Sequence, residues 1–239
     1  MLRTIFYYIT FYPFTLICSI IALFASFLGA ERSHAVAIFW GRICLRLAGG
    51  EIRIEGRENI PGDSSAVIFM ANHSSSFDIP ALYAALPVQF RWLAKKELFD
   101  VPLFGMALKR SGYIPVERND SRKALLALKS AAQRVKDGTS VIVFPEGTRS
   151  PDGNLLPFKG GGFILAIQSG MPVVPVAIIG SRDITPKGSL SVRAADILIR
   201  ILPPIETFGL KSSDREQLSG KVRQSIDSAL HPTPVTHGK

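Results

Sequence analysis

His73 and Asp78 lie five positions apart in a polar turn between two apolar runs, residues 66–71 and 79–82. The first run predicts a buried strand and the second a helix, whose start the turn serines and Asp78 would cap. Across such a turn, the carboxylate can fold back onto the imidazole. Asp78 would then hold one ring nitrogen protonated and leave the other to accept a proton, which is the arrangement of a general base. Taken alone, the pattern also fits a capped helix beside a histidine with no chemical role.

A second polar turn, residues 145–150, follows the apolar run at residues 141–144 and carries Glu146 and Arg149. This run also predicts a strand that ends at a polar turn. In open parallel sheets, ligands collect at the carboxyl ends of the strands. We therefore expect His73 and Glu146, each just past a strand, to face one site.

The two turns together resemble the glycerolipid acyltransferase superfamily, and most closely its lysophosphatidic acid acyltransferases (1-acylglycerol-3-phosphate O-acyltransferases). That family carries an N-H-x-x-x-x-D block, here residues 72–78, and an F-P-E-G-T-R-S block, here residues 144–150. Two weaker blocks follow the same order, at residues 112–118 and 174–177. Four blocks in order are more specific than either strong block alone, and the resemblance runs from about residue 52 to residue 203.

The resemblance implies acyl transfer from a thioester to the sn-2 hydroxyl of 1-acylglycerol 3-phosphate, which gives phosphatidic acid in phospholipid biosynthesis. An alcohol attacks poorly unless a base takes its proton as the bond forms. His73 is the expected base, and Asp78 is expected to stabilise the imidazolium. The resemblance implies direct transfer. The alternative makes Ser74, Ser75 or Ser76 a nucleophile, although the sequence holds no G-x-S-x-G turn.

The phosphate of the acceptor requires cations, and three are expected to bind it. Arg149 offers paired donors to phosphate oxygens, and Gly147 lets the backbone approach a ligand. Thr148 lies between them and is expected to line the same site. Lys95 matches the position of a second phosphate-binding cation in the family, and Arg118 is the third candidate, just beyond a predicted strand. A solvated surface charge is the alternative for each cation.

Glu146 is expected to bind the glycerol hydroxyls or to orient His73; capping its turn and pairing with Arg149 is the structural alternative. The mechanism needs no metal, and no His/Cys/Asp cluster has metal-ligand spacing. We expect no cofactor, because acyl-CoA or acyl carrier protein would bring the thioester as co-substrate. Two other functions stay open. One is acyl transfer to another lysolipid such as lyso-ornithine lipid, and the other is non-catalytic binding of anionic lipid.

Strands and helices alternate along residues 49–210, which predicts one α/β acyltransferase domain with a mostly parallel β-sheet flanked by helices. Residues 211–239 are expected to add a C-terminal amphipathic helix and a tail. Helices are expected around residues 79–86, 97–109, 121–136 and 161–169. The expected strands are residues 51–55, 66–70, 90–94, 113–116, 140–144, 173–179 and 197–201.

Residues 1–48 are expected to form a membrane-associated helical segment. Residues 5–30 carry no charged side chain, which suits a membrane-crossing helix or a hairpin held in one leaflet. A cleaved signal peptide is the alternative for this run. The next segment, residues 35–48, holds Arg42 and Arg46 on one face. It predicts an interfacial helix, or a core helix with two snorkelling arginines. Because cations are richer after the first run than before it, the catalytic domain is expected on the cytoplasmic side of a bacterial-type inner membrane.

The composition agrees with a membrane-facing enzyme and limits the partners. Of the 239 residues, 47% are hydrophobic, which suits one domain with a large core and an apolar surface. The formal charge of +9 indicates an anionic partner, namely membrane lipid or a phosphorylated substrate. Nucleic acid is not expected, because the cations are spread out and no zinc-finger or RNP-like motif is present.

Overall fold

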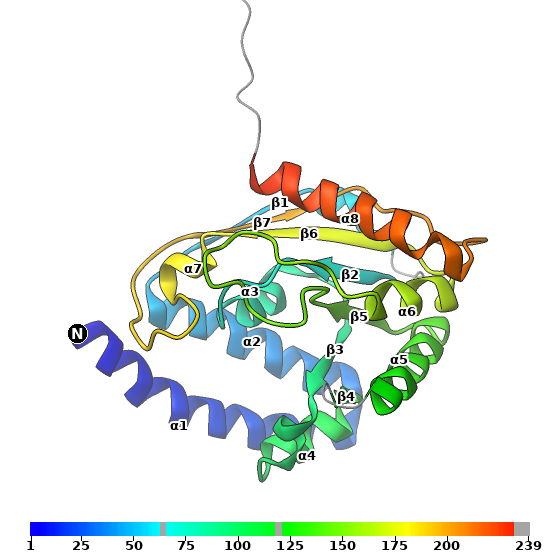
Figure 1. The fold of residues 1–239 in the computed structure, drawn as a ribbon. Helices are drawn as coiled ribbons and strands as arrows, with labels where there is room; N and C mark the ends of the chain where they lie inside the picture. Colours follow the sequence, from blue (N-terminus) through cyan, green and yellow to red (C-terminus); the bar gives the residue numbers. More distant parts are fainter. Residues whose placement is uncertain (63–65, 118–120, 232–239) are drawn as a thin grey trace, which may run out of the picture.

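A seven-stranded sheet lies at the centre of the computed structural model, which describes residues 1–62, 66–117 and 121–231 (Figure 1). The strand order is β1-β7-β6-β2-β5-β3-β4, and β6 and β7 form the antiparallel pair in an otherwise parallel sheet. The predicted mostly parallel sheet is confirmed. The strands are β1 (Ile52–Glu55), β2 (Ile68–Ala71), β3 (Phe90–Lys95), β4 (Ile114–Val116), β5 (Ser140–Val143), β6 (Val173–Ile179) and β7 (Ile197–Ile201).

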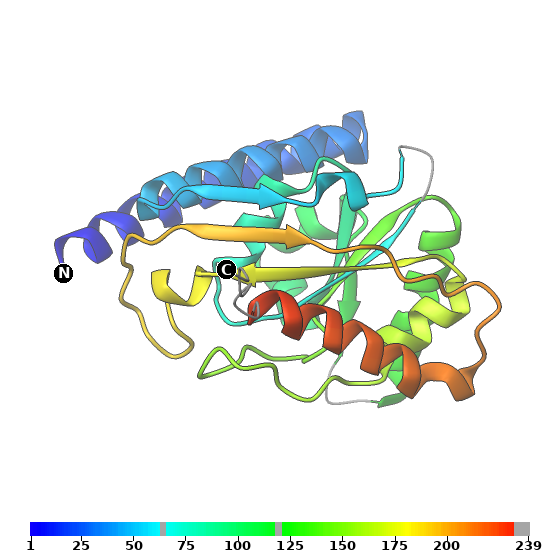
Figure 2. The same cartoon turned by 90° about the horizontal axis from the view of Figure 1, so that it is seen from above.

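Helices cover both faces of the sheet, so each central strand is buried on two sides. In β2, Phe69 and Ala71 pack into the core beneath α2 (Ala30–Ala48) and α3 (Asp78–Ala85). The alternating residues Ile68 and Met70 enter the opposite core. Figure 2 shows the N-terminal helices on one side of the sheet and α8 on the other. The helices that line the second core are α5 (Ser121–Lys136), α6 (Gly161–Ser169) and α8 (Arg215–Leu230), preceded by η4 (Ser212–Asp214).

The N-terminal segment forms a helical hairpin of α1 (Leu2–Ala25), the short η1 (Ser26–Leu28) and α2. Within the described residues, the stretch Leu2–Leu28 is the one helix long and apolar enough to cross a membrane. Its outer face is apolar, and large hydrophobic side chains such as Ile9 and Leu16 are more than half exposed there. Helix α2 packs closely on α3, where a Cβ atom at Gly41 would lie 2.7 Å from the carbonyl oxygen of Pro80.

Two local expectations are wrong, and one short helix was not expected. The helix expected at residues 97–109 is split into η3 (Lys96–Asp100) and α4 (Phe104–Arg110), because Pro102 offers no N–H and holds the preceding residue extended. A short helix, α7 (Ser181–Ile184), follows β6 without having been expected. The start of α3 has no side-chain cap, since Asp78 turns back towards the preceding turn.

Candidate active site

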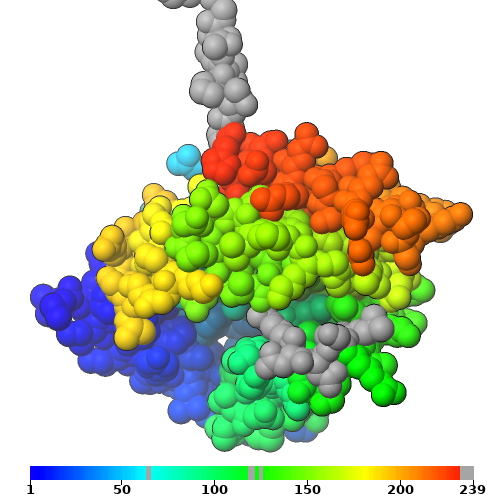
Figure 3. Space-filling view, in the orientation of Figure 1, coloured from blue at the N-terminus to red at the C-terminus, as the bar shows by residue number. Residues whose placement is uncertain are grey.

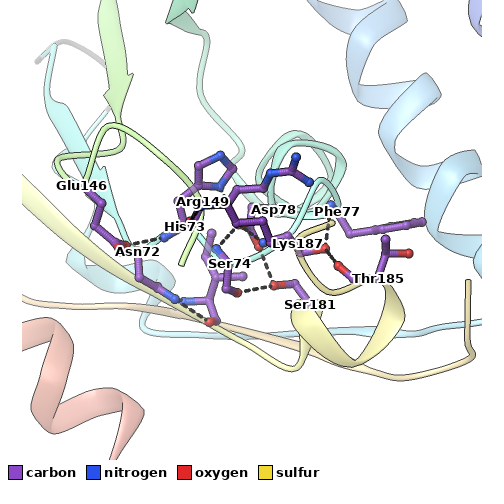
Figure 4. A network of polar contacts seen from close by, with 12 residues as sticks. Asn72, His73, Ser74, Phe77, Asp78, Glu146, Arg149, Ser181, Thr185 and Lys187 are labelled. Carbon is purple, nitrogen blue, oxygen red and sulfur yellow. Dashed lines mark hydrogen bonds and ion pairs between the residues drawn. The ribbon is translucent and has the colours of Figure 1, made fainter. Parts of the chain in front are cut away.

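The two polar turns meet because their strands are neighbours in the sheet. Strands β2 and β5 pair in parallel, with Ile68 opposite Val141, so their carboxyl ends reach the same edge. The turn after β2 carries His73, and the turn after β5 carries Glu146 (Figure 4). The backbone joins them too, because the Ser150 N–H donates to the His73 carbonyl at 2.7 Å.

His73 and Asp78 form the expected pair. The Nδ1–H of His73 donates to Oδ2 of Asp78 at 2.7 Å, and the same oxygen accepts the backbone N–H groups of Ser74 at 2.8 Å and Ser75 at 2.9 Å. Asp78 is fully buried. Within the described part of the chain, Nε2 of His73 has no hydrogen-bond partner, and the ring borders a cavity. The geometry therefore leaves one imidazole nitrogen available for proton transfer.

Aromatic side chains hold the plane of the His73 ring. Phe144 stacks on the imidazole with 3.9 Å between ring centroids, at an interplanar angle of 9°. Trp92 stacks on the far side of Phe144 at 5.3 Å. With Nδ1 fixed by Asp78 and one ring face by Phe144, the imidazole has little freedom to turn away from the cavity.

Glu146 braces the backbone of His73. Its Oε1 accepts the His73 N–H at 2.7 Å, and its Oε2 accepts the Leu156 N–H at 3.0 Å. Burial raises the pKa of this carboxyl, and the two N–H donors oppose the rise. Of the roles expected for Glu146, this geometry favours the one that orients His73. Within the described residues no ion pair joins Glu146 to Arg149, and each carboxylate oxygen accepts a backbone N–H.

Arg149 and Thr148 lie on the same turn as Glu146, at the edge of the site. Figure 4 draws Arg149 and Lys187 among the residues around His73, and the neighbouring Ser150 N–H bonds to the His73 carbonyl. The Lys187 ammonium donates to the Arg149 carbonyl at 2.7 Å and lies 3.5 Å from the Thr148 hydroxyl. Lys187 was not expected here, because its loop is far from both polar turns in the sequence and reaches them only through the pairing of β6 with β2. Gly147 takes the left-handed φ of +70° that this turn requires.

The other two expected cations are placed differently. Lys95 ends β3, borders the cavity and forms a 3.0 Å ion pair with Glu97, both side chains being more than half exposed. Such an exposed pair contributes little to stability, so Lys95 can exchange partners. Arg118 lies outside the described residues.

An apolar cavity of about 390 Å³ opens beside His73. Its walls come from α1, α2, α3, β3 and α4, and Figure 3 shows a hollow between the blue N-terminal helices and the green segment that contains α4. Most of the lining is hydrocarbon or aromatic. Representative lining residues are Thr15, Ala22, Trp40, Tyr83, Trp92 and Leu108.

Buried polar groups to which the sequence assigned no role tie this site to β6. The Asn72 side chain donates to the Ile178 carbonyl at 2.9 Å and accepts the Ile178 N–H at 2.7 Å. The Ser181 hydroxyl donates to Oδ1 of Asp78 at 2.5 Å. The available signal was polar residues following an apolar strand, but the sequence does not reveal that β6 lies next to β2.

Comparison with known proteins decides the family. A family model described as Acyltransferase matches residues 51–179, which is more than half of the chain. The chain belongs to this acyltransferase family. Its match runs from β1 to the end of β6, and so contains both polar turns but stops before Ser181. The resemblance drawn from the four sequence blocks is thereby confirmed.

Relatives in this family carry names that agree with the resemblance. A chloroplastic 1-acyl-sn-glycerol-3-phosphate acyltransferase of Arabidopsis thaliana is 38% identical over 198 residues, which cover 82% of this chain and 54% of that protein. A chloroplastic enzyme of the same name from Brassica napus is 35% identical, with coverages of 83% and 56%. The chain therefore spans little more than half the length of these relatives.

A solved structure matches nearly the whole acyltransferase chain. It is the crystal structure of the 1-acyl-sn-glycerophosphate (LPA) acyltransferase from Thermotoga maritima, with a TM-score of 0.80 and 27% sequence identity. The match covers 98% of this chain and 97% of that one. The N-terminal hairpin and β7, which the family model leaves out, are therefore within the shared fold.

Proposed function

We propose that the chain transfers a fatty acyl group from a thioester to the sn-2 hydroxyl of 1-acylglycerol 3-phosphate, giving phosphatidic acid. The observation that carries this proposal is the imidazole with one unengaged nitrogen at the mouth of an apolar cavity. The printed names of the relatives and of the Thermotoga enzyme support the same acceptor.

The proposed reaction is a direct transfer with His73 as general base. Nε2 takes the proton of the acceptor hydroxyl as its oxygen attacks the thioester carbonyl, so that the C–O bond forms and the C–S bond breaks. The imidazolium returns the proton to the departing thiolate, while the Asp78 carboxylate stabilises the positive ring. No metal or cofactor takes part. Acyl-CoA or acyl carrier protein is the co-substrate.

The serine nucleophile mechanism has little structural support. The Ser74 hydroxyl lies 3.2 Å from that of Ser181, and the Ser75 hydroxyl donates to the Thr185 carbonyl at 2.8 Å. Both serines are buried, and neither hydroxyl bonds to His73. Ser76 is exposed.

One assay tests the proposed acceptor. Purified protein in detergent should consume acyl thioester fastest with lysophosphatidic acid, and more slowly with lyso-ornithine lipid or lysophosphatidylcholine. Arg149→Ala should raise the KM for lysophosphatidic acid roughly 10- to 100-fold, since charge-assisted hydrogen bonds contribute about 1.5–3 kcal/mol. Lys95→Ala should do the same more mildly, because this exposed cation is already paired with Glu97.

Lys221→Ala, an exposed cation on the opposite face of the sheet, is the matched control. Unchanged kinetics in both site variants would move the phosphate site elsewhere. Faster turnover with lyso-ornithine lipid would assign that acceptor instead, and lipid binding without thioester consumption would favour the non-catalytic alternative.

The outer face of α1 is proposed to lie in the lipid, with the catalytic domain on the cytoplasmic side of a bacterial-type inner membrane. Ile9 is 68% exposed and Leu16 is 51% exposed, and neither lines the cavity. Changing both to serine should therefore preserve the fold and weaken sedimentation with liposomes, because about 1.5–3 kcal/mol of membrane burial is lost for each side chain. Leu126→Ser, an equally exposed position on α5, is the control.

Unchanged liposome binding would remove α1 from the membrane contact. The side of the membrane is tested separately, by protease added outside spheroplasts. Digestion of the intact domain would contradict the cytoplasmic placement.

A further inference from the structure

Ser181 sits where the chain leaves β6 and begins α7. The turn into α7 depends on Gly180, which has φ +88°, and a Cβ atom there would lie 2.2 Å from the Asp196 carbonyl oxygen. Ser181 is fully buried, and its hydroxyl donates to Oδ1 of Asp78 at 2.5 Å. This serine is therefore held against the carboxylate that the proposed mechanism pairs with His73.

The two oxygens of Asp78 have unequal partners. Oδ2 accepts three donors, which are Nδ1 of His73 and the backbone N–H groups of Ser74 and Ser75. Within the described residues, Oδ1 accepts the Ser181 hydroxyl alone. Because Asp78 is fully buried, bulk water does not replace that donor. The rotation of the carboxylate about its Cβ–Cγ bond is thus fixed from the Oδ1 side by one hydroxyl.

We propose that Ser181 is a positioning residue for the general base. By holding Oδ1, it keeps Oδ2 aimed at Nδ1 of His73, and so keeps Nε2 as the nitrogen that accepts the proton. Ser181 does not touch the substrate in this proposal, which rests on the proposed role of His73. The serine lies beyond the residues matched by the family model, and it reaches the site through the adjacency of β6 and β2.

A purely structural role for Ser181 is less well supported, because other hydrogen bonds already join the turn after β2 to β6 and α7. The Asn72 side chain joins the first turn to Ile178 of β6 by two hydrogen bonds. The Ser75 hydroxyl joins the turn to the Thr185 carbonyl just past α7. Loss of the Ser181 hydroxyl leaves these three bonds in place. It removes the 2.5 Å bond to Asp78 and the longer, 3.2 Å contact with the Ser74 hydroxyl, so its main effect should fall on Asp78.

The test compares three substitutions by steady-state kinetics in detergent. Ser181→Ala should lower kcat with lysophosphatidic acid and acyl-CoA roughly 10- to 100-fold, as expected when a reacting group is misplaced. The KM for each substrate should stay within about twofold of the wild-type value, because no substrate contact is lost. Ser181→Cys keeps the size of the side chain but donates weakly, so its kcat should be intermediate. Ser181→Thr restores the hydroxyl and should restore most of kcat.

Ser169→Ala is the matched control, since this buried serine donates to the Ala166 carbonyl on the other face of the sheet. It should leave kcat unchanged. A Ser181→Ala kcat within about twofold of wild type would overturn the proposal, as would a loss shared by Ser169→Ala. If the Ser181→Ala variant does not fold, Ser181→Cys provides the test. A wild-type kcat in Ser181→Cys would likewise overturn the proposal.

A proton NMR measurement, which requires no turnover, tests the positioning role of Ser181 separately from the proposed acyl transfer. The Nδ1 proton of His73 should give a downfield proton NMR signal, assigned by its absence in His73→Ala. Ser181→Ala should shift or broaden this signal, and Ser181→Thr should restore it. An unchanged signal would overturn the positioning role even in an active enzyme. Absence of thioester turnover in the wild-type protein would instead overturn the proposed function, and the NMR comparison would still test Ser181.

Discussion

Replacing His73 with alanine should lower turnover by about 10²- to 10⁴-fold, the usual contribution of a general base. The structure explains why the fold should survive. The bonds that join this residue to Glu146 and Ser150 use its backbone atoms, which alanine keeps. Asp78 would still accept the N–H groups of Ser74 and Ser75. The measurement is single-turnover acyl transfer at saturating substrates, together with Tm and lysolipid binding.

His231→Ala is the control for this experiment, because His231 is a largely exposed histidine at the end of α8, paired with Asp227. It should retain the wild-type rate. A His73→Ala rate above roughly a tenth of wild type would remove the general-base assignment, since that residual rate is too high for loss of the base.

The contact between His73 and Asp78 could be predicted from sequence because it is local. Both residues belong to one strand, turn and helix, and five positions are enough to place the carboxylate behind the imidazole. The prediction that Asp78 caps the helix was wrong, and the cause is also local. Its carboxylate can face either the helix start or the turn, and here the turn and the His73 ring supply the donors.

Contacts that depend on strand order could not be derived in the same way. Glu146 reaches His73 because β5 lies beside β2, and Ser181 reaches Asp78 because β6 lies on the other side of β2. Hydrophobic patterns indicate where strands are but not which strands pair. The rule that ligands collect at the carboxyl ends of parallel strands placed His73 and Glu146 at one site, whereas Ser181 lies outside the four recognised blocks.

The N-terminal segment shows a further limit of composition. Its uncharged sequence indicated lipid contact, and this remains the proposal for the outer face of α1. The inner face instead lines the cavity through Phe11, Thr15, Cys18, Ser19 and Ala22. Apolar composition does not distinguish a surface that meets lipid from one that lines a cavity. Deleting this segment would therefore open the cavity as well as weaken membrane binding, which is why surface substitutions make the sharper test.

We propose that the apolar cavity beside His73 holds the acyl chain of the thioester, which predicts a limit on the length of that chain. It extends from His73 to the hydroxyls of Ser33 and Ser111, which meet at 2.6 Å where α2 begins and α4 ends. Ala107 lines the cavity one helical turn before Ser111, whose N–H donates to the Ala107 carbonyl at 2.9 Å. A phenylalanine at position 107 should therefore fill part of the cavity beside Ser33 and Ser111.

Ala107→Phe should reduce kcat/KM for the acyl-CoA whose chain fills the cavity, and spare shorter donors. Each buried methylene contributes about 0.8 kcal/mol, so excluding three should cost about 2.4 kcal/mol, or roughly 50-fold. The measurement is kcat/KM across a series of saturated acyl-CoA donors. Ser130→Phe, at an exposed position of α5 on the opposite face, should leave the series unchanged. An equal loss for every chain length would indicate general damage, and an unaltered preference would place the acyl chain outside this cavity.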